Sequence, residues 1–484
     1  MHHRADLIRI ATEAMQERQL LTGFSPQVLQ ELAHIPGPAQ DSDATIRDLR
    51  ALLWCSIDND DSLDLDQLTC IEMHEDGSSR MYVAVADVDA LVKKGSAIDD
   101  HARTNGATVY TSACIFSMLP ERLSTDLTSL NGGVDRLAVV TEMVFSAHGE
   151  LERFQVYRAR VHNQAKLAYD AVALWLDGAG ALPLAAAQVP GMEQQLQQQD
   201  ALAQKIRLLR HTKGSLELET FQPRAEFEGE MVVAITQQVQ NRARQLIEEI
   251  MIATNHCNAR FLAHTGVSSI RRVVRSPERW LRIVELARQY GEALPPEPSS
   301  RALEAFLARR HLADPLRFAD LSLVVVKLMG SGEYVVEAPG ELAIGHFGLA
   351  VRDYTHSTAP NRRFPDLVTS RLLKAAIQRT EPPYSAHELG ALAQHCTRQE
   401  DSARKVERRM RKSDAALFLE PRIGQEFKAI VTGNSPKGLW VRLLEPPIEG
   451  KLLASSAPPI GTQLEVRLVL TDVERGFIDF VIAA

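Results

Sequence analysis

Cysteine is scarce in this chain of 484 residues, and the few cysteines are scattered. The five contain no Cys-x-x-Cys pair, which argues against a zinc ribbon and against a disulfide scaffold. A run of about eighteen apolar residues, as a membrane span requires, is absent, and the N-terminus lacks the apolar core of a secretory signal. We therefore expect a cytoplasmic protein with buried free thiols and no membrane partner. The cysteines are Cys55, Cys70, Cys114, Cys257 and Cys396.

Positive charge is not in excess either, since the formal net charge is −8. A protein that coats DNA is usually basic, so this class is disfavoured. Basic residues are nevertheless clustered at 271–275, 362–363 and 404–412, and such clusters can hold RNA in an internal channel, where only the local field matters. Hydrophobic residues at 45% are ordinary for a globular protein, and the length predicts roughly two to four domains.

Residues 1–48 are expected to form a small helical unit. An apolar stripe at helical spacing runs from Leu7 to Met15, and Ser25-Pro26 is a favourable helix start with a capping hydroxyl and a proline in the first turn. Two alternatives stay open for this unit. It is either a helix-turn-helix domain or a helical brace for the region that follows.

Residues 49–420 alternate irregularly between strand-like and helical patterns, which is typical of an α+β fold. The runs 68–72 and 81–86 flank Asp76-Gly77 and predict a β-hairpin. A glutamine-rich helix at 192–204 is expected on the surface. Residues 421–484 carry short alternating runs at 427–431 and 464–469, which predict a small β-barrel.

The stretch from Asp58 to Asp66 holds five aspartates in nine residues. A solvated acidic loop, a calcium loop and a catalytic metal site are three competing interpretations. The calcium loop fails because Leu63 and Thr69 stand where it needs glycine and glutamate. Carboxylate oxygens suit magnesium in phosphoryl transfer. Leu63 and Leu65 alternate with Asp64 and Asp66, so an extended segment would turn the leucines toward a core and the aspartates to the other side.

The same stretch resembles the catalytic signature of the ribonuclease II / ribonuclease R family, an Ile-Asp followed six residues later by Asp-x-Asp-Asp. Asp58, Asp64 and Asp66 match three aspartates, and Gln67 replaces the fourth, so one metal ion would be held by less charge. Residues 354–367 resemble the family motif Tyr-Thr-His-Phe-Thr-Ser-Pro-Ile-Arg-Arg-Tyr-Pro-Asp-Leu. Further similar runs lie at 85–88, 118–130 and 246–251.

With the helical unit 1–48 predicted from its own pattern, we expect an α+β protein of three parts, and the resemblance implies a large mixed catalytic domain of RNB type at 49–420 and an OB-fold RNA-binding barrel at 421–484. It implies a 3′-to-5′ hydrolytic exoribonuclease that degrades single-stranded RNA to nucleoside 5′-monophosphates by two-metal-ion catalysis. The expected cofactor is Mg²⁺, with Mn²⁺ as a substitute and no organic cofactor, and the expected state is a monomer. Because of Gln67, the alternative is a catalytically impaired RNA-binding protein of the same fold.

The resemblance also assigns roles to residues. Asp58, Asp64 and Asp66 hold metal, with Gln67 at the fourth position, and Arg362 binds the reacting phosphate. Expected RNA contacts are Tyr110 and Tyr169 at the terminal nucleotides, Glu248 or Glu249 at the last sugar, Arg363, Glu407, and on the barrel Phe427, Lys437, Trp440 and Arg442. A salt bridge on the helix face is the alternative for Glu407, and His346 is expected to be a packed histidine without chemistry.

One departure from the family concerns the N-terminal side. Typical members carry two cold-shock OB domains ahead of the catalytic domain, whereas about fifty residues precede Asp58. We expect that these domains are replaced or lost, and that RNA enters by a different route.

Overall fold

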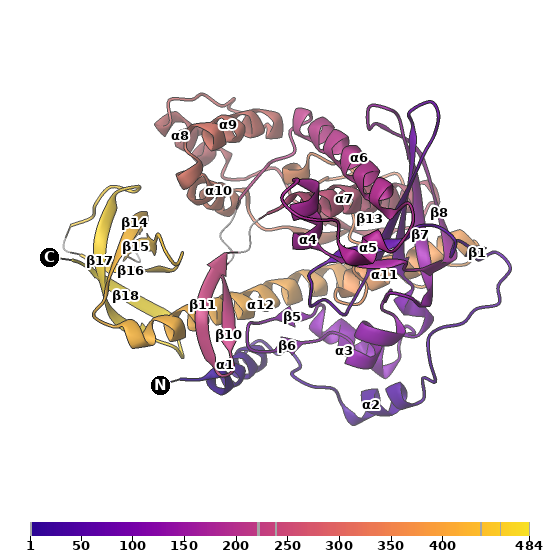
Figure 1. Cartoon of the computed structure of the whole chain (residues 1–484), viewed down its shortest axis with the longest axis horizontal. Coiled ribbons are helices and arrows are strands. Elements are labelled where there is room, and N and C mark those ends of the chain that lie inside the picture. Colours follow the sequence, from indigo (N-terminus) through magenta and orange to yellow (C-terminus); the bar gives the residue numbers. More distant parts are fainter. Residues whose placement is uncertain (1, 220–222, 238–239, 436–437, 455, 484) are drawn as a thin grey trace.

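The computed structural model describes residues 2–219, 223–237, 240–435, 438–454 and 456–483. A mixed sheet with helices packed on it lies at one end of the molecule, and a small barrel lies at the other (Figure 1). The long helix α12 (Ala386–Leu419) runs between the two parts. Among the described residues, no helix combines the length and the apolar character needed to cross a membrane.

The central sheet has seven strands in the order β1-β8-β7-β4-β3-β2-β9. The two edge strands, β1 and β9, run parallel to their neighbours, and the other pairs are antiparallel. The strands are β1 (Arg47–Asp48), β2 (Cys55–Asp58), β3 (Gln67–Met73), β4 (Ser79–Ala86), β7 (Asp135–Phe145), β8 (Leu151–His162) and β9 (Ala165–Ala168). The hairpin predicted around Asp76-Gly77 is confirmed as β3–β4, and Gly77 has the left-handed φ of +80° that its turn requires.

Strand β4 shows why the sequence around it is almost continuously apolar. Met81, Val83 and Val85 face a core shared with α6 (Met192–Thr212) and α7 (Arg242–His264). The alternate residues, such as Tyr82 and Ala84, face a second core, which contains residues of α11 (Phe364–Gln378). Because side chains alternate along a strand, a sheet covered on both faces needs apolar residues at every position.

The glutamine-rich helix α6 is not the surface element expected from its composition. Gln195 and Gln199 are buried, and Gln195 Oε1 accepts a hydrogen bond from the backbone N–H of Ile71 at 2.9 Å. Strand β2 pairs with β3 only at Thr69, so this N–H has no strand partner on that side. A buried side-chain amide thus accepts from the part of β3 that is not paired with β2, and the expectation of a surface helix was wrong for this face of α6.

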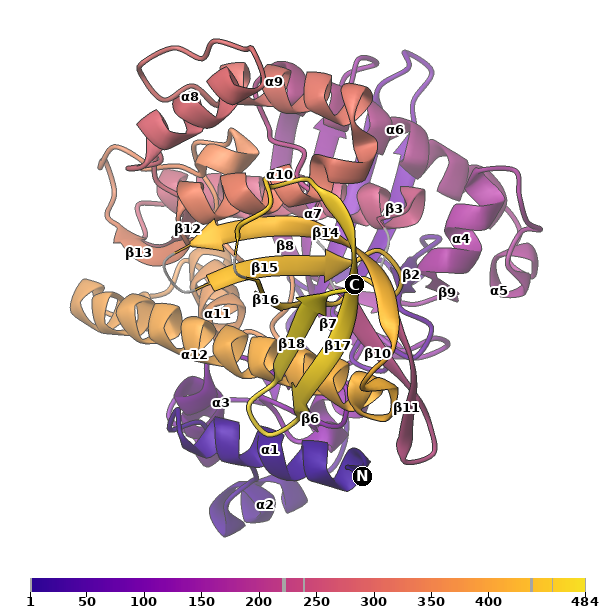
Figure 2. The ribbon, with the colours of Figure 1, turned by 90° about the vertical axis from the view of Figure 1, so that its left-hand side faces the viewer.

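The two N-terminal helices contribute to different cores. The apolar stripe of α1 (Arg4–Gln16) packs in a core with α12 and the barrel, whereas Val28 of α2 (Pro26–Ala33) belongs to a core of the sheet. Figure 2 shows α1 beneath α12. The Ser25 hydroxyl caps α2 by accepting from Val28 N–H at 3.3 Å. Residues 1–48 therefore have no core of their own among the described residues, and this placement supports the brace alternative.

The predicted C-terminal barrel is confirmed. It is closed in the order β14-β15-β16-β18-β17, and Figure 2 shows it in front of α12 and below α10. An ion pair at 2.8 Å joins Arg442 of the barrel to Asp320 of α10. The barrel strands are β14 (Glu426–Ser435), β15 (Gly438–Leu443), β16 (Glu449–Leu453), β17 (Gln463–Asp472) and β18 (Phe477–Ile482).

Two small hairpins lie between the sheet and the barrel, β5 (Val109–Tyr110) with β6 (Ile115–Phe116) and β10 (Pro223–Glu228) with β11 (Met231–Gln237). Three further helices form a separate core around Trp280, Phe306 and Phe318. These helices are α8 (Trp280–Gln289), α9 (Ser300–Ala313) and α10 (Pro315–Met329). The remaining elements are α3 (Ala97–Asn105), α4 (Tyr169–Leu176), α5 (Leu184–Ala187), β12 (Ser269–Val273), β13 (Glu333–Glu337) and four short turns of helix, η1 (Val88–Ala90), η2 (Arg122–Leu127), η3 (Phe347–Leu349) and η4 (Glu420–Arg422).

Candidate active site

The acidic stretch forms the connection between β2 and β3. Asp66 is fixed at its end, because its backbone carbonyl accepts from Ala86 N–H at 3.0 Å and its Oδ1 accepts from Asn361 N–H at 2.9 Å. Leu65 is in the core, as expected from its alternation with the aspartates. Leu63 is not, since 54% of it is exposed, and that part of the expectation was wrong. The backbone carbonyl of Leu63 instead accepts from Ser129 Oγ at 2.7 Å.

Asp66 carries a charge inside the protein that its neighbours compensate only in part. Only 2% of the residue is exposed, and burial raises the pKa of its carboxyl group to about 7. Among the described residues, nothing donates a hydrogen bond to Oδ2, although Arg362 Nε lies 3.3 Å away. Burying a carboxylate without full pairing is costly, so this oxygen is suited to bind a cation.

Asp58 and Asp64 share the environment of Asp66. Asp58 Oδ1 accepts from Asn59 N–H at 2.7 Å and from Ser62 Oγ at 3.0 Å, and Asp64 Oδ2 accepts from Tyr110 OH at 3.2 Å. Burial raises the pKa of Asp64, and the charge of Asp58 adds to this effect. The hard oxygens of these three carboxylates are the donors that Mg²⁺ or Mn²⁺ prefers.

The neighbouring acids contribute less. Asp60 and Asp61 are exposed, and Asp61 Oδ2 pairs with Arg224 of β10 at 3.4 Å. Gln67 begins β3 and is 8% exposed. Its neutral amide adds no further charge at a place where Asp66 is already poorly compensated.

Arg362 lies opposite Asp66 on the loop before α11, where Phe364 and Pro365 begin the helix. Its carbonyl accepts from Thr108 N–H at 2.9 Å, which joins this loop to the segment that carries Tyr110. Burial lowers the pKa of Arg362, but the nearby Asp66 and other anions outweigh this effect and raise it. The side chain of Arg362 is 45% exposed, so its charge remains available to a phosphate.

Arg363 has a different environment. Its Nη2 donates to Asp366 Oδ1 at 2.7 Å, in a pair that spans the start of α11. The carboxylate of Asp366 is fully buried and also accepts from Ala359 N–H at 2.9 Å. The two arginines of the motif are thus placed differently, one at the carboxylates and one at the helix start.

Tyr110 is 39% exposed, which is not the burial of a core tyrosine. Its backbone N–H donates to Glu407 Oε1 of α12 at 3.3 Å, and burial raises the pKa of Glu407. Within the part of the chain that the structure describes, Glu407 makes no ion pair, so the salt bridge considered for it is not what the geometry favours. Glu407 instead holds the strand that points Tyr110 at Asp64.

The turn after Tyr110 is also held by Asp414, which predicts a pH dependence of stability. Ser112 Oγ donates to Asp414 Oδ1 at 2.6 Å, and burial raises the pKa of Asp414 to about 7. The folded state therefore holds this proton more tightly than the unfolded state, and stability falls as pH rises from about 4 to about 7. Asp414→Asn should remove this loss, so the free energy of unfolding of the variant relative to wild type should be up to about 3 kcal/mol higher at pH 8 than at pH 5.

Denaturant unfolding of both proteins at the two pH values measures this effect. Asp472→Asn, which changes an aspartate of the barrel, is the control. Its free energy of unfolding should differ from that of wild type by the same amount at pH 5 and pH 8. If the free energies of unfolding of Asp414→Asn and wild type differed by the same amount at both pH values, the raised pKa given to Asp414 would be contradicted.

Tyr169 and Glu248 lie on the other side of the acidic loop. The Arg244 guanidinium lies over the Tyr169 ring at 4.5 Å, and its Nη2 donates to Asn59 Oδ1 at 2.9 Å. Sequence reasoning missed Arg244, although its position one helical turn before Glu248 placed both on one face of a helix. A cavity of about 730 Å³ begins here, and Arg244 and Glu248 line it.

The structure distinguishes the two candidate glutamates. Glu249 is buried and accepts from Arg210 Nη1 at 2.6 Å. Glu248 is exposed on the cavity and accepts from Gln240 Nε2 at 2.8 Å. Glu248 is the one that can reach a ligand. His346 lines the same cavity; it accepts from Leu349 N–H at 3.1 Å, and burial lowers its pKa to about 4, as suits a packed neutral histidine.

A second group of possible metal ligands lies near this cavity. His211, Glu217 and Glu304 have ligand atoms within 4.8 Å of one another, which among the described residues is true of no other such group. These side chains already have partners, since His211 Nδ1 is 3.0 Å from Glu304 Oε1 and the Glu217 carboxylate forms an ion pair with Arg207. The three aspartates are spread more widely than this group, so they do not close around a single point.

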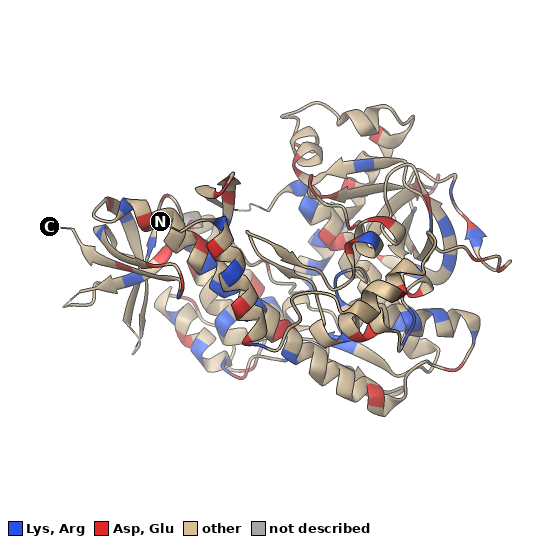
Figure 3. Cartoon of the chain, turned by 90° about the horizontal axis from the view of Figure 1, so that it is seen from below, with Lys and Arg blue, Asp and Glu red and all other residues tan. Residues whose placement is uncertain are grey.

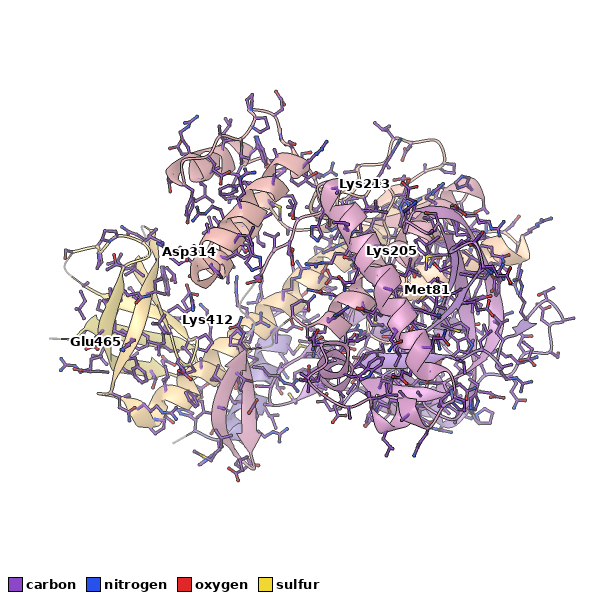
Figure 4. The ribbon with its side chains drawn as sticks, turned by 45° about the horizontal axis from the view of Figure 1, so that its top comes forward. Met81, Lys205, Lys213, Asp314, Lys412 and Glu465 are labelled. Carbon is purple, nitrogen blue, oxygen red and sulfur yellow. The ribbon has the colours of Figure 1, made fainter. Side chains whose placement is uncertain are left out.

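The basic clusters and the barrel residues have mixed environments. Arg271 and Arg272 are buried in ion pairs with Glu337 and Glu400, whereas the basic residues of 404–412 lie on α12, which also carries acidic residues (Figure 3). Lys412 of α12 lies next to the barrel (Figure 4), 6.0 Å from the centre of the Trp440 ring. Phe427 packs against the barrel core, Arg442 pairs with Asp320, and Lys437 lies outside the described residues.

Three carboxylates facing an arginine, beside two part-exposed tyrosines and an RNA-binding type of barrel, are typical of enzymes that cleave phosphodiesters in nucleic acids. The RNB domain family matches residues 46–379, and the RNase II-type exonuclease C-terminal S1 domain matches residues 425–483. The chain belongs to the RNB-domain family, and the resemblance to ribonuclease II and ribonuclease R is confirmed.

Named relatives agree with this assignment. The chain is 28% identical to ribonuclease R of Aquifex aeolicus, over 96% of this chain and 69% of that protein. It is 30% identical to ribonuclease R of Escherichia coli, over 84% of this chain and 51% of that protein. The chain thus spans about half to two thirds of the length of these relatives.

Solved structures share the fold. RNase R of Mycoplasma genitalium matches with a TM-score of 0.89 and 22% identity, over 99% of this chain and 78% of that one. Yeast Ssd1, described as a pseudonuclease, matches with a TM-score of 0.73 and 16% identity, over 95% of this chain and 58% of that one. Because the fold also occurs in a pseudonuclease, the argument for catalysis depends on the residues of the site and not on the fold.

Proposed function

We propose that this protein is a 3′-to-5′ hydrolytic exoribonuclease that degrades single-stranded RNA to nucleoside 5′-monophosphates. The observation that carries the proposal is the buried Asp66 carboxylate, which has an oxygen without a hydrogen-bond donor and faces Arg362. A protein that only binds RNA gains nothing from burying a poorly paired carboxylate next to the arginine that would bind a phosphate. The relatives named ribonuclease R support the same activity.

Asp58, Asp64 and Asp66 would hold Mg²⁺, with Mn²⁺ as a substitute, and Gln67 would offer at most a neutral amide oxygen. Among the described residues, the ligand atoms of these three carboxylates do not all lie within 4.8 Å of one another, which suits two ions better than one. Bound metal supplies activation of water and stabilisation of the leaving oxygen. Asp61 and Asp60 do not replace the missing charge of Gln67, because both side chains are exposed.

Arg362 would stabilise the negative charge of the reacting phosphate. Its guanidinium can donate two hydrogen bonds to phosphate oxygens, whose charge grows in the transition state. Asp66 orients it at 3.3 Å, and the exposed half of the side chain faces away from the core. The residue thus links the carboxylates to the substrate.

The remaining polar and aromatic side chains would bind RNA without reading its sequence. Tyr110 and Tyr169 offer aromatic faces to the terminal nucleotides, and Glu248 offers a carboxylate to the last sugar, where contact with the 2′-hydroxyl distinguishes RNA from DNA. Trp440 lies on the barrel, Glu407 acts through Tyr110, and Arg363 contributes positive charge from the start of α11. We place this activity in a cytoplasmic monomer with the catalytic region at 49–420 and the RNA-binding barrel at 421–484.

Incubation of 5′-labelled poly(A) with the protein and Mg²⁺ tests the proposal. The expected result is a ladder that shortens from the 3′ end, with AMP as the released product, and no cleavage when EDTA removes the metal. An intact substrate in both samples, together with retained binding of the RNA, would contradict the enzyme and support the catalytically impaired binder.

A further inference from the structure

Helix α1 contacts both hairpins that reach the acidic loop. It lies beneath α12 close to β10–β11 (Figures 1 and 2) and precedes the segment that matches the RNB domain. One residue of this helix, Arg4, contacts both hairpins directly. The contacts of Arg4 therefore connect the N-terminus to the site through two separate routes.

The first route leads to Asp64. Arg4 Nε and Nη2 both donate to the carbonyl of Ala113, at 3.3 and 3.2 Å. Ala113 lies in the turn of β5–β6, the hairpin that carries Tyr110, and Tyr110 OH donates to Asp64 Oδ2 at 3.2 Å. The arginine thus fixes one end of a four-residue turn whose other end touches a candidate metal ligand.

The second route leads to Asp61. Arg4 N–H donates to the carbonyl of Glu230 at 3.1 Å, in the turn of β10–β11, and its guanidinium lies 5.2 Å from the centre of the Phe227 ring. At the other end of the same hairpin, Arg224 pairs with Asp61 of the acidic loop at 3.4 Å. Both hairpins thus run from Arg4 to the acidic loop.

Packing shows that α1 is part of this arrangement and not an attached segment. Leu7, Ile10 and Ala14 of α1 are fully buried in a core that also contains Val109 and Ala113 of the first hairpin region. The same core includes Ala225, Val232 and Ile235 of β10–β11, and Val406 and Met410 of α12. Apolar burial of this extent holds the helix in one place, and the two hairpins receive a common fixed support.

We infer that Arg4 is a positioning residue for the active site, because its guanidinium fixes the hairpin whose opposite end contacts Asp64. The expected loss of kcat rests on the proposed function, whereas the expected loosening of the hairpin does not. Loss of the Arg4 contacts would loosen the turn at Ala113 and let Tyr110 leave Asp64. Since small displacements of aligned groups cost much of the rate, kcat should fall while the RNA contacts that determine KM remain.

The test compares Arg4→Ala with wild type by hydrogen exchange of the full chain without RNA, followed by kinetics on poly(A). In Arg4→Ala, amides of residues 109–116 should exchange about tenfold faster, because a charge-assisted pair of hydrogen bonds is lost from their turn. Amides of β4 should exchange as in wild type. The kcat should fall about tenfold with KM within about twofold, and Arg4→Lys, which can still donate to Ala113, should recover part of the loss.

Arg9→Ala is the matched control, because Arg9 lies on the same helix but pairs with Glu13 and with Glu474 of the barrel. It should leave exchange at 109–116 and kcat unchanged. Unchanged exchange in Arg4→Ala, or an equal increase in Arg9→Ala, would overturn the inference whatever the activity. Faster exchange in Arg4→Ala alone, in a protein whose wild type does not cleave RNA, would support the positioning role and overturn the proposed function instead.

Discussion

Asp66→Asn should reduce cleavage of single-stranded RNA by at least about 100-fold, the scale on which losing one electrostatic contact at a reacting centre acts. The change keeps the size of the side chain and an oxygen that can accept from Asn361 N–H. It removes the charge at Oδ2, to which no described residue donates a hydrogen bond. Binding of RNA should stay within about twofold, because stacking and other phosphate contacts remain.

The fold of this variant should not be weakened. Burial already raises the pKa of Asp66 to about 7, so a neutral amide relieves an unfavourable charge. Its midpoint of thermal unfolding should equal or exceed that of wild type in the absence of metal. Asp61→Asn is the matched control on the same loop, and its rate should stay near that of wild type because Asp61 is exposed. Full activity of Asp66→Asn would show that the metal site has been misassigned.

Arg362→Ala should lower kcat about 100-fold to 1000-fold, because it removes a guanidinium that binds the phosphate more strongly as its charge grows. KM should change much less. Arg362→Lys retains the charge without the planar guanidinium, so its kcat should lie between those of wild type and Arg362→Ala. Single-turnover rates on a short oligo(A) measure the chemical step. Because Asp66 loses its nearest cation, the pKa of Asp66 should also be higher in metal-free Arg362→Ala than in metal-free wild type.

Arg275→Ala controls for the loss of an arginine. Arg275 pairs with Glu333 on the surface at 2.6 Å, so its removal should leave kcat near the wild-type value. A kcat for Arg362→Ala within about twofold of wild type would contradict the role given to this residue. It would also leave Asp66 facing a cation that has no part in the reaction.

Local patterns in the sequence were enough to predict the elements that depend on neighbouring residues. The spacing of Asp58, Asp64 and Asp66, the alternation in the barrel strands, and the turn at Gly77 are of this kind, since each is set by a few consecutive residues. The barrel and the β3–β4 hairpin were predicted correctly for this reason. The resemblance of the motif around Arg362 predicted a phosphate-binding residue there, but not its pairing with Asp66.

Contacts between distant residues could not be read from such patterns. Asn361 N–H binds Asp66 across 295 positions of sequence, and nothing local to either residue indicates it. The Arg362–Asp66 pair is also long-range, whereas Arg363 pairs with Asp366 only three positions away, and the two adjacent arginines gave no sign of which would face the carboxylates. Composition was misleading for α6, because Gln195 satisfies a backbone N–H that only the finished sheet leaves without a partner.

The N-terminal unit illustrates the same limit. The apolar stripe of α1 predicted a helix correctly, but a stripe does not say which surface will cover it. In the structure it lies against α12, the barrel and both hairpins, and this arrangement gives Arg4 its contacts. The choice between a separate helical domain and a brace therefore depended on tertiary packing.

The most direct test of the central claim, a metal site built by the acidic loop, is a titration with Mn²⁺ followed by electron paramagnetic resonance. The titration uses ribose-methylated oligo(A), bound to wild type, Asp66→Asn and Asp61→Asn. We expect wild type and Asp61→Asn to bind the same number of Mn²⁺ ions, and Asp66→Asn to bind fewer ions or to bind them at least about tenfold more weakly. Equal Mn²⁺ binding by Asp66→Asn and wild type would contradict the claim.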